Sequence, residues 1–548
     1  MSVSRGDSHN RRGADGNLSA AAAAIGLAVV AFTTATARPT HAGTFELAEV
    51  FGSGMVLQQA QPVRIWGRAD TGDRVSVSFG DDTASVTTDE RGHWIATLPA
   101  RQASSEPESL VVCRDQDRRQ LDNLLVGEVW LAAGQSNMLL PLAKAEDASR
   151  EIAAAERPTV RLLMLEAAAG GDRRRYTPAQ IAALEPSRFF RGSWQPCTPQ
   201  TAVGFSAVGS FFGASLADQL GVPVGVICVA VGGSPTEAWV RRGAIAADPA
   251  LAAITEKPWL DNPAVAGWCS ERARLQLAGV EVGSLPGDAS GPNHPFKPGF
   301  LWEAGIAPLV PLAIRGVVWY QGESNAESPD RVAQHTPLLS RLITDWRRAW
   351  NRPRLPFGVV QLPGMQRPSW PAFRESQRRL AESLPGVGLV VTLDLGLRSD
   401  VHPPDKRPIG ERLARWAAVE VYGREGTSTG PVPERAFCRE GSIVVRFRDT
   451  PGGLATTDGK PPRHFAVRRR EGVFQPADAT IEGDSVRLET TMPAAEVAVV
   501  GYGQAGFPEP PVNLTDTSGL PATPFLLEID QSQTRSPAEP PPPIADPP

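Results

Sequence analysis

LLVGEVWLAAG, residues 124–134, is a near-continuous apolar run that ends in glycine. Helix-like stretches separate it from four later runs of the same character: VGVICVAVGG (224–233), IRGVVWYQG (314–322), LPFGVVQL (355–362) and VGLVVTLDLG (387–396). Buried strands that alternate with helices are typical of βαβ units and a parallel sheet. The sequence therefore predicts a doubly wound α/β domain, to which we assign residues 119–428.

The segments on either side of this domain are predicted to be β structure. In residues 43–118, RVSVSF (74–79) alternates polar and apolar residues, and turn residues separate the short strands, which predicts an N-terminal β-sandwich-like domain. Alternation returns over residues 429–530, in SIVVRF and SVRLET, and predicts a C-terminal β region. Residues 531–548 are rich in proline and form a predicted disordered tail.

The N-terminus has the features of an export signal. Arg11 and Arg12 precede an apolar stretch over residues 18–32, and Ala35-Thr36-Ala37 and Thr40-His41-Ala42 are both possible small-residue cleavage sites. This order describes a secretory signal peptide over residues 1–42, because a membrane anchor needs a longer apolar run of about 20 residues. We therefore expect an exported protein, periplasmic or extracellular, with no membrane segment in its mature form.

Composition narrows the classes of function. The 548 residues carry a formal net charge of −5 and lack the basic character of a nucleic-acid binder, so we expect no nucleic-acid partner. The five cysteines have no C-x-x-C spacing, which argues against a zinc ribbon or a redox dithiol, and we predict no metal site. An exported chain could carry one or two disulfides among them. The sequence leaves the oligomeric state open.

Polar and small residues follow the apolar runs, where a parallel sheet places its ligands. A serine hydroxyl needs an imidazole base oriented by a carboxylate, and a developing oxyanion needs preorganised N–H donors. Ser136 alone could be a helix N-cap, and His402 alone a structural histidine. Four blocks of polar and small residues stand at these positions: Gly134-Gln135-Ser136-Asn137, Gly232-Gly233-Ser234, Gln321-Gly322-Glu323-Ser324-Asn325 and Asp400-Val401-His402. Together they favour acyl transfer, with Ser136 as nucleophile and His402 as general base.

The chain also resembles the sialate O-acetylesterase family of the SGNH hydrolase superfamily. The resemblance implies a three-layer, flavodoxin-like SGNH hydrolase domain with flanking β regions. It further implies a carboxylic ester hydrolase that removes acetyl groups from sugars and needs no cofactor. The similar segments run in order over nearly the whole mature chain: FGSGMVLQQAQPVRIWG (51–67), VGEVWLAAGQSNM (126–138), GGSPTEAW (232–239), IAPLVPLAIRGVVWYQGESN (306–325), DLGLRSDVHPPDKRPIGERLA (394–414) and LPATPF (520–525).

The resemblance assigns roles to individual residues. Ser136 matches the family nucleophile, His402 the base, and Gly233 the second oxyanion donor beside the Ser136 amide. The third block departs from the widespread Gly-x-Asn-Asp pattern, because a serine stands where the amide donor is expected. We predict Gln321 as the third donor, with Asn325 as the alternative.

The orienting acid is a second departure. Many SGNH members have Asp-x-x-His, whereas one residue separates Asp400 from His402 here. We predict Asp400 as the orienting acid and keep Asp394 as the alternative. Around the nucleophile, the predicted supporting residues are Gln135, Asn137 and Glu323.

The identity of the sugar stays open. Val-Ala-Val precedes the second glycine pair, where sialate O-acetylesterase relatives commonly carry a tryptophan, and Trp302-Glu303 stands in another predicted wall segment. Residues 241–297 are predicted to line the site with Trp259, Trp268 and His294, although core packing explains these side chains equally well. An acetylxylan esterase or another carbohydrate acetylesterase is the second candidate, and an inactive carbohydrate-binding protein the third. The expected partner is an acetylated carbohydrate.

Overall fold

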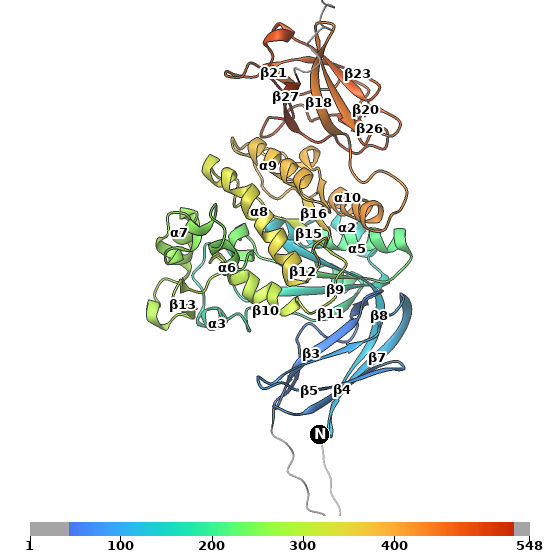
Figure 1. Cartoon of the computed structure of the whole chain (residues 1–548), viewed down its shortest axis with the longest axis vertical. Helices are drawn as coiled ribbons and strands as arrows, with labels where there is room; N and C mark the ends of the chain where they lie inside the picture. Colours follow the sequence, from blue (N-terminus) through green and yellow to red (C-terminus); the bar gives the residue numbers. More distant parts are fainter. Residues whose placement is uncertain (1–42, 531–548) are drawn as a thin grey trace, which may run out of the picture. The chain divides into compact units, whose positions relative to one another are not determined.

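The computed structural model describes residues 43–530, and its central element is a parallel sheet (Figure 1). The strands lie in the order β10-β9-β12-β8-β15-β16-β17. Neighbours from β9 to β17 run parallel, and β10 and β11 pair antiparallel with β9. The fold is therefore α/β, as predicted. The strands are β8 (Asp117–Gly134), β9 (Arg157–Ala167), β10 (Phe190–Arg191), β11 (Trp194–Cys197), β12 (Val224–Ala230), β15 (Gly316–Tyr320), β16 (Phe357–Val360) and β17 (Val387–Val390).

The predicted apolar runs coincide with β8, β12, β15, β16 and β17, whereas β9 was not predicted. The sequence of β9, RPTVRLLMLEA, contains two arginines and a glutamate, which interrupt the apolar pattern of a buried strand. Its middle, residues 160–163, is buried, and its ends are partly exposed although the antiparallel strands β10 and β11 pair with its outer edge. The apolar-run criterion therefore finds the inner strands and misses this one.

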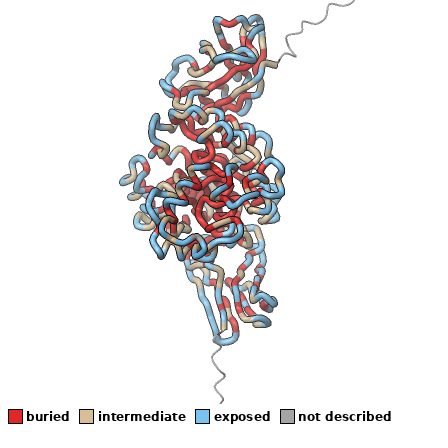
Figure 2. The backbone as a smooth tube through the Cα atoms, turned by 90° about the vertical axis from the view of Figure 1, so that its left-hand side faces the viewer, coloured by how far each residue is buried: buried red, intermediate tan, exposed pale blue. Residues whose placement is uncertain are grey.

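Alternate side chains of β8 enter two separate hydrophobic clusters. Val129 and Leu131 pack in one cluster with residues of α8, whereas Trp130 and Ala132 pack in another with residues of α5 and α10. Figure 2 shows many buried residues in the part of the chain that holds this sheet. The helices are α1 (Ser136–Leu139), α2 (Ala148–Ala153), α3 (Pro178–Ala182), α4 (Pro199–Ala202), α5 (Ala207–Leu220), α6 (Arg242–Ala246), α7 (Gly267–Gln276), α8 (Pro329–Ala349), α9 (Trp370–Ser383) and α10 (Arg407–Trp416).

The N-terminal region is mostly antiparallel β structure, in which only β2 pairs parallel with β8, and it shares the strand β8 with the central sheet. β8 is mostly exposed up to Asn123 and buried from Leu124 onward, where it joins the central sheet. One strand thus spans the predicted boundary between residues 118 and 119. The other strands here are β1 (Phe45–Leu47), β2 (Val56–Gln58), β3 (Val63–Ala69), β4 (Arg74–Phe79), β5 (Asp82–Thr87), β6 (His93–Leu98) and β7 (Ser104–Arg114).

The C-terminal region forms an eight-stranded sheet in the order β22-β21-β25-β27-β18-β19-β24-β23, with a separate pair β20-β26. Most residues of its hydrophobic cluster come from these strands and the loops between them, which explains the alternating pattern of the sequence. The strands are β18 (Val432–Arg439), β19 (Ser442–Arg448), β20 (Leu454–Thr456), β21 (Phe465–Arg468), β22 (Gln475–Pro476), β23 (Asp478–Glu482), β24 (Ser485–Glu489), β25 (Val499–Tyr502), β26 (Leu514–Asp516) and β27 (Phe525–Asp530).

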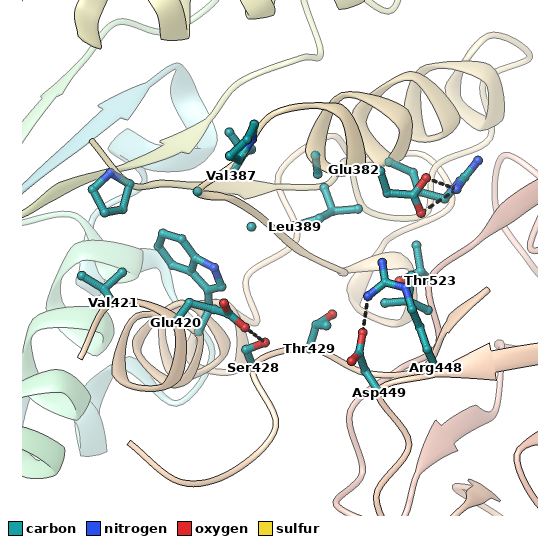
Figure 3. Close-up of a pocket in the computed structure, with 18 of the residues that line it drawn as sticks. Glu382, Val387, Leu389, Glu420, Val421, Ser428, Thr429, Arg448, Asp449 and Thr523 are labelled. Atoms are coloured by element: carbon teal, nitrogen blue, oxygen red, sulfur yellow. Dashed lines mark hydrogen bonds and ion pairs between the residues drawn. The ribbon is translucent and has the colours of Figure 1, made fainter. Parts of the chain in front are cut away.

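A cavity of about 650 Å³ borders the edge strand β17 (Figure 3). Val387 and Leu389 of β17 line it, together with Glu382 of α9 and with Arg448 and Thr523 of the C-terminal region. None of the predicted catalytic or oxyanion residues is among the lining residues. This cavity is therefore separate from the candidate site described below.

Two predictions fall on the ends of the chain. The predicted signal peptide (1–42) and the proline-rich tail (531–548) lie outside the described residues. Between residues 43 and 530, no helix has both the length and the apolar character that a membrane span requires. All five cysteines belong to this part of the chain and are free thiols, so no disulfide joins them.

Candidate active site

Ser136 lies at the carboxyl end of β8, immediately after a tight approach between two strands. Gly134 has a φ of 146°, and a Cβ atom there would meet the Tyr320 carbonyl oxygen at 2.1 Å, so only glycine fits. Gln135 occupies the N-cap of α1, and Ser136 is the first helical residue. The N-cap alternative for Ser136 therefore does not apply, and its hydroxyl faces another partner.

That partner is His402, whose Nε2 lies 2.8 Å from the Ser136 Oγ. The histidine comes from the loop between β17 and α10, so residues 266 positions apart meet at one edge of the sheet. Burial lowers the pKa of His402 below its usual 6.5; Asp400 raises it and Lys406 and Lys144 lower it. The imidazole is therefore neutral at pH 7 and able to accept a proton.

The two candidate orienting acids have different surroundings. Asp400 Oδ1 lies 3.7 Å from His402 Nδ1 and accepts a 2.9 Å hydrogen bond from the His402 backbone N–H. Asp394 instead accepts two hydrogen bonds from the Arg412 guanidinium, at 2.9 and 2.6 Å. Asp400 is thus the carboxylate that approaches the imidazole, at a distance longer than a hydrogen bond.

The Gly232-Gly233 turn after β12 lies beside the nucleophile. A Cβ atom on Gly232 would stand 3.8 Å from the Ser136 Cβ, and Gly233 has a φ of 74°, in the region that favours glycine. The Ser324 hydroxyl donates to the Gly233 carbonyl at 3.0 Å. This contact joins the turn to the loop after β15.

The two candidates for the third oxyanion donor are buried in a network that leads away from Ser136. Gln321 Nε2 donates to the Ser234 carbonyl at 3.2 Å and to Asn325 Oδ1 at 2.7 Å, so both of its amide hydrogens are taken. Asn325 Nδ2 donates to Glu237 at 3.0 Å. No hydrogen bond between the described residues joins either side chain to Ser136.

Gln135 has a different environment from these two side chains. Its Oε1 accepts from the Ser324 backbone N–H at 3.4 Å, and the residue is 3% exposed. Its Nε2 donates to no acceptor within residues 43–530. The residue before the nucleophile thus has an amide N–H with no acceptor among the described residues, and its amide oxygen contacts the loop that binds the Gly233 carbonyl.

The predicted supporting residues Asn137 and Glu323 are hydrogen-bonded to each other, and Lys406 is hydrogen-bonded to Asn137. Asn137 donates to Glu323, accepts a 2.6 Å hydrogen bond from Lys406 Nζ, and donates to the Val401 carbonyl at 2.8 Å. Sequence reasoning missed Lys406. Its only signal was its place four residues after His402, which does not reveal that the side chain turns inward.

The aromatic side chains predicted to line the site mostly do not. Trp259 is buried and donates to the Pro292 carbonyl at 2.9 Å, and His294 is buried against Gln276 at 2.8 Å. Trp302, from the other predicted wall segment, is also buried. Trp268 is half-buried and packs edge-on against Phe296, which lies against the Gly233 turn. His294 also contacts Phe296, with ring centroids 4.8 Å apart, so Trp268 and His294 both have an indirect link to the site.

Comparisons with known proteins find carbohydrate esterases among the similar sequences and structures. A family model described as "carbohydrate esterase, sialic acid-specific acetylesterase" matches residues 303–418, which include His402. Sialate O-acetylesterase of Homo sapiens is 28% identical over 435 residues, covering 71% of this chain and 74% of that protein. The Mus musculus enzyme is 26% identical over 537 residues, covering 88% and 94%. A crystal structure of a novel carbohydrate acetylesterase from Xanthomonas citri matches with a TM-score of 0.72 and 30% identity, covering 88% of this chain and 99% of that one.

Proposed function

The chain belongs to the sialate O-acetylesterase family of carbohydrate esterases, and on that premise we propose that it removes O-acetyl groups from sugars with Ser136 as its nucleophile. It is a carboxylic ester hydrolase. The observation that carries the proposal is the 2.8 Å contact between Ser136 Oγ and His402 Nε2 at the carboxyl edge of a parallel sheet. A neutral imidazole at this distance can take the hydroxyl proton as the oxygen attacks.

The proposed reaction has two steps. His402 takes the Ser136 proton while Oγ bonds to the acetyl carbonyl carbon, and the oxyanion is stabilised by the N–H groups of Ser136 and Gly233. The C–O bond to the sugar then breaks, His402 returns the proton to the sugar oxygen, and an acetyl-enzyme remains. In the second step, His402 takes a proton from water, whose oxygen attacks the acetyl carbonyl carbon. The bond to Ser136 Oγ then breaks, His402 returns the proton to Oγ, and acetate leaves. Every group needed comes from the chain, so the reaction requires no cofactor.

We assign the third oxyanion donor to Gln135 in place of the predicted Gln321 and Asn325. An oxyanion donor must keep a hydrogen free for the transition state, because a preorganised N–H stabilises the charge without rearrangement. Both Gln321 hydrogens are already donated, whereas Gln135, the residue before Ser136, has an Nε2 that is free among the described residues. Gln321 then serves to hold the loop after β15 in place.

The wider arrangement belongs to the same proposal. A three-layer SGNH hydrolase domain over residues 119–428 would follow from helices on both faces of the sheet, with β regions over 43–118 and 429–530. Export of the protein, by the predicted signal peptide, would expose the site to extracellular or periplasmic glycans. An acetylated carbohydrate is the proposed substrate partner.

A broader carbohydrate acetylesterase, such as an acetylxylan esterase, is the second candidate. The Xanthomonas citri carbohydrate acetylesterase is 30% identical, against 26–28% for the sialate O-acetylesterases reported above. Carbohydrate binding alone does not require a serine hydroxyl at 2.8 Å from a neutral imidazole, which disfavours the third candidate, an inactive binding protein. Sugar preference is therefore the point on which the first two candidates differ.

Replacing Asp400 by asparagine is expected to lower kcat by about 10–100-fold. The amide keeps the shape but loses the charge that favours the imidazolium; the full ~10⁴-fold effect of such a change needs a direct hydrogen bond. The Asp400–His402 distance of 3.7 Å and the 61% exposure of the Asp400 side chain predict the smaller loss. Asp394→Asn is the matched control, because its carboxylate binds Arg412. Steady-state kinetics on p-nitrophenyl acetate check this, and an inactive Asp394→Asn beside an active Asp400→Asn would exchange the roles.

We expect kcat/KM to fall steadily from acetyl to butyryl to octanoyl esters. The reason is the polar surrounding of the nucleophile, where Gln135, Glu323 and Ser324 stand in place of an apolar acyl channel. In a hydrophobic pocket that fits it, each methylene contributes about 1–3 kcal/mol of binding free energy. A site without such a pocket gains no binding energy from a longer acyl chain. A series of p-nitrophenyl esters measures this. A maximum at octanoyl would favour a lipase over a sugar esterase.

A further inference from the structure

The residue after the nucleophile is buried and joins three segments of the chain. Asn137 has no exposed surface. Its Nδ2 donates to Glu323 in the loop after β15 and to the carbonyl of Val401, the neighbour of His402; its Oδ1 accepts from Lys406 near the start of α10. One amide therefore connects the loops that carry the nucleophile, the third block and the base.

The Asn137 amide lies between an acidic side chain, Glu323, and a basic one, Lys406. Glu323 is 5% exposed and Lys406 is fully buried. The Asn137 N–H points to the carboxylate and the Asn137 carbonyl oxygen to the ammonium, which is the orientation that an amide takes between a negative and a positive group. Lys406 also lies 5.2 Å from the Tyr320 ring centroid. The amide is thus held at both ends, and its rotation is blocked.

Burial works against the charged forms of both groups. Burial raises the pKa of Glu323, and the Asn137 hydrogen bond and Lys406 lower it. Burial lowers the pKa of Lys406 to about 7, and Glu323, Asp405 and Asp400 raise it. The second carboxylate oxygen of Glu323 has no partner among the described residues. Burying two such groups costs desolvation energy and adds little to the free energy of folding. Stability alone therefore does not account for Glu323 and Lys406 at these positions.

We propose that Asn137, Glu323 and Lys406 form a positioning network that sets the His402 imidazole against the Ser136 hydroxyl. The inference rests on the proposed function, because it takes Ser136 and His402 as the catalytic pair. The Val401 carbonyl is the direct link: its bond to Asn137 fixes the backbone one residue before His402. Lys406 fixes the Asn137 amide in the orientation that this bond requires.

The test removes the charges singly and together in the full chain. Lys406→Met and Glu323→Gln each leave an uncompensated buried group, so each is expected to lower Tm, whereas the double variant should regain Tm. In all three, kcat on p-nitrophenyl acetate should fall about 10–100-fold with KM within about twofold, since a misplacement of about 1 Å can cost ~10² in rate. Recovery of Tm without recovery of kcat is the expected signature.

The matched control is an ion pair away from the network, between the buried Glu128 and the partly exposed Arg315. Glu128 of β8 is fully buried and receives two hydrogen bonds from Arg315, at 2.7 and 2.9 Å, far from the strand end that carries Ser136. Glu128→Gln and Arg315→Met should lower Tm without lowering kcat. The pH profile adds a second measurement, because Lys406 lowers the pKa of His402 and Lys406→Met should move the acid limb upward.

The outcomes separate this inference from the proposed function. A double variant that is folded and keeps kcat within twofold of wild type would overturn the network. A fall in kcat equal to that of the Glu128 and Arg315 variants would also overturn it. An inactive wild type, or an active Ser136→Ala, would instead overturn the proposed function. Wild-type activity that needs Ser136, together with a kcat loss confined to the network variants, supports both.

Discussion

Ser136→Ala is expected to lower kcat on p-nitrophenyl acetate by about 10⁴–10⁶-fold while leaving the fold intact. Removing the nucleophile of a serine hydrolase leaves only the contribution of the oxyanion donors and of binding, and losses of about 10⁶ are known for such changes. The lost atom is one hydroxyl oxygen whose contact is with His402, so the free energy of unfolding should change little. Steady-state kinetics and thermal unfolding of the same preparation measure both.

Ser328→Ala is the matched control for the first prediction. Ser328 is a true N-cap, whose side chain accepts from the Arg331 backbone N–H at the start of α8. Its replacement should cost about 1 kcal/mol of stability and leave kcat unchanged. Ser136→Ala and Ser328→Ala should therefore show opposite effects on activity and stability. An active Ser136→Ala would remove the nucleophile assignment.

His402→Ala is expected to lower kcat by a similar factor of about 10⁴–10⁶. The two residues act as a unit, so the double variant Ser136→Ala/His402→Ala should be no worse than either single variant. The exposed His93 in β6 provides the control, since His93→Ala should keep full activity. Additive losses in the double variant would show that the two side chains act independently.

The pH profile of the wild type follows from the same residue. The base must be neutral to accept a proton, so kcat/KM should rise with pH through the pKa of His402 and level off above it. Burial lowers this pKa below 6.5, so the enzyme should keep its activity to a lower pH than a free imidazole would allow. His402→Ala should abolish this acid limb.

The sequence predicted most strands of the central sheet, because a strand that is buried on both faces has a nearly continuous apolar sequence. β8, β12, β15, β16 and β17 appear as apolar runs, and the alternate residues of β8 are buried in two separate hydrophobic clusters. The sequence also predicted that Ser136 and His402 lie at the same edge of the sheet. Both follow strands of a parallel sheet, and ligands bind at the carboxyl ends of such strands. The strand β9 was not predicted because two arginines and a glutamate interrupt its apolar pattern.

Side-chain direction at the strand ends could not be predicted. Gln321 follows β15 directly, yet its amide turns toward Ser234 and Asn325, because those groups supply the partners that a buried amide requires. Lys406 belongs to a polar stretch and reads as an exposed residue. It is buried because Asn137 and Glu323 lie beneath the loop, a contact between segments more than 80 residues apart.

Acetate release from acetylated sugars by wild type and Ser136→Ala, measured side by side on O-acetylated sialic acid and acetylated xylan, tests the proposed function most directly. The wild type should release acetate from at least one of the two, one acetate for each acetyl group lost, and Ser136→Ala should release none above the uncatalysed rate. Preference for sialic acid or for xylan then decides between the two candidate substrates. Acetate release by Ser136→Ala at the wild-type rate, or none from either sugar by the wild type, would contradict the assignment of a Ser136-dependent sugar esterase.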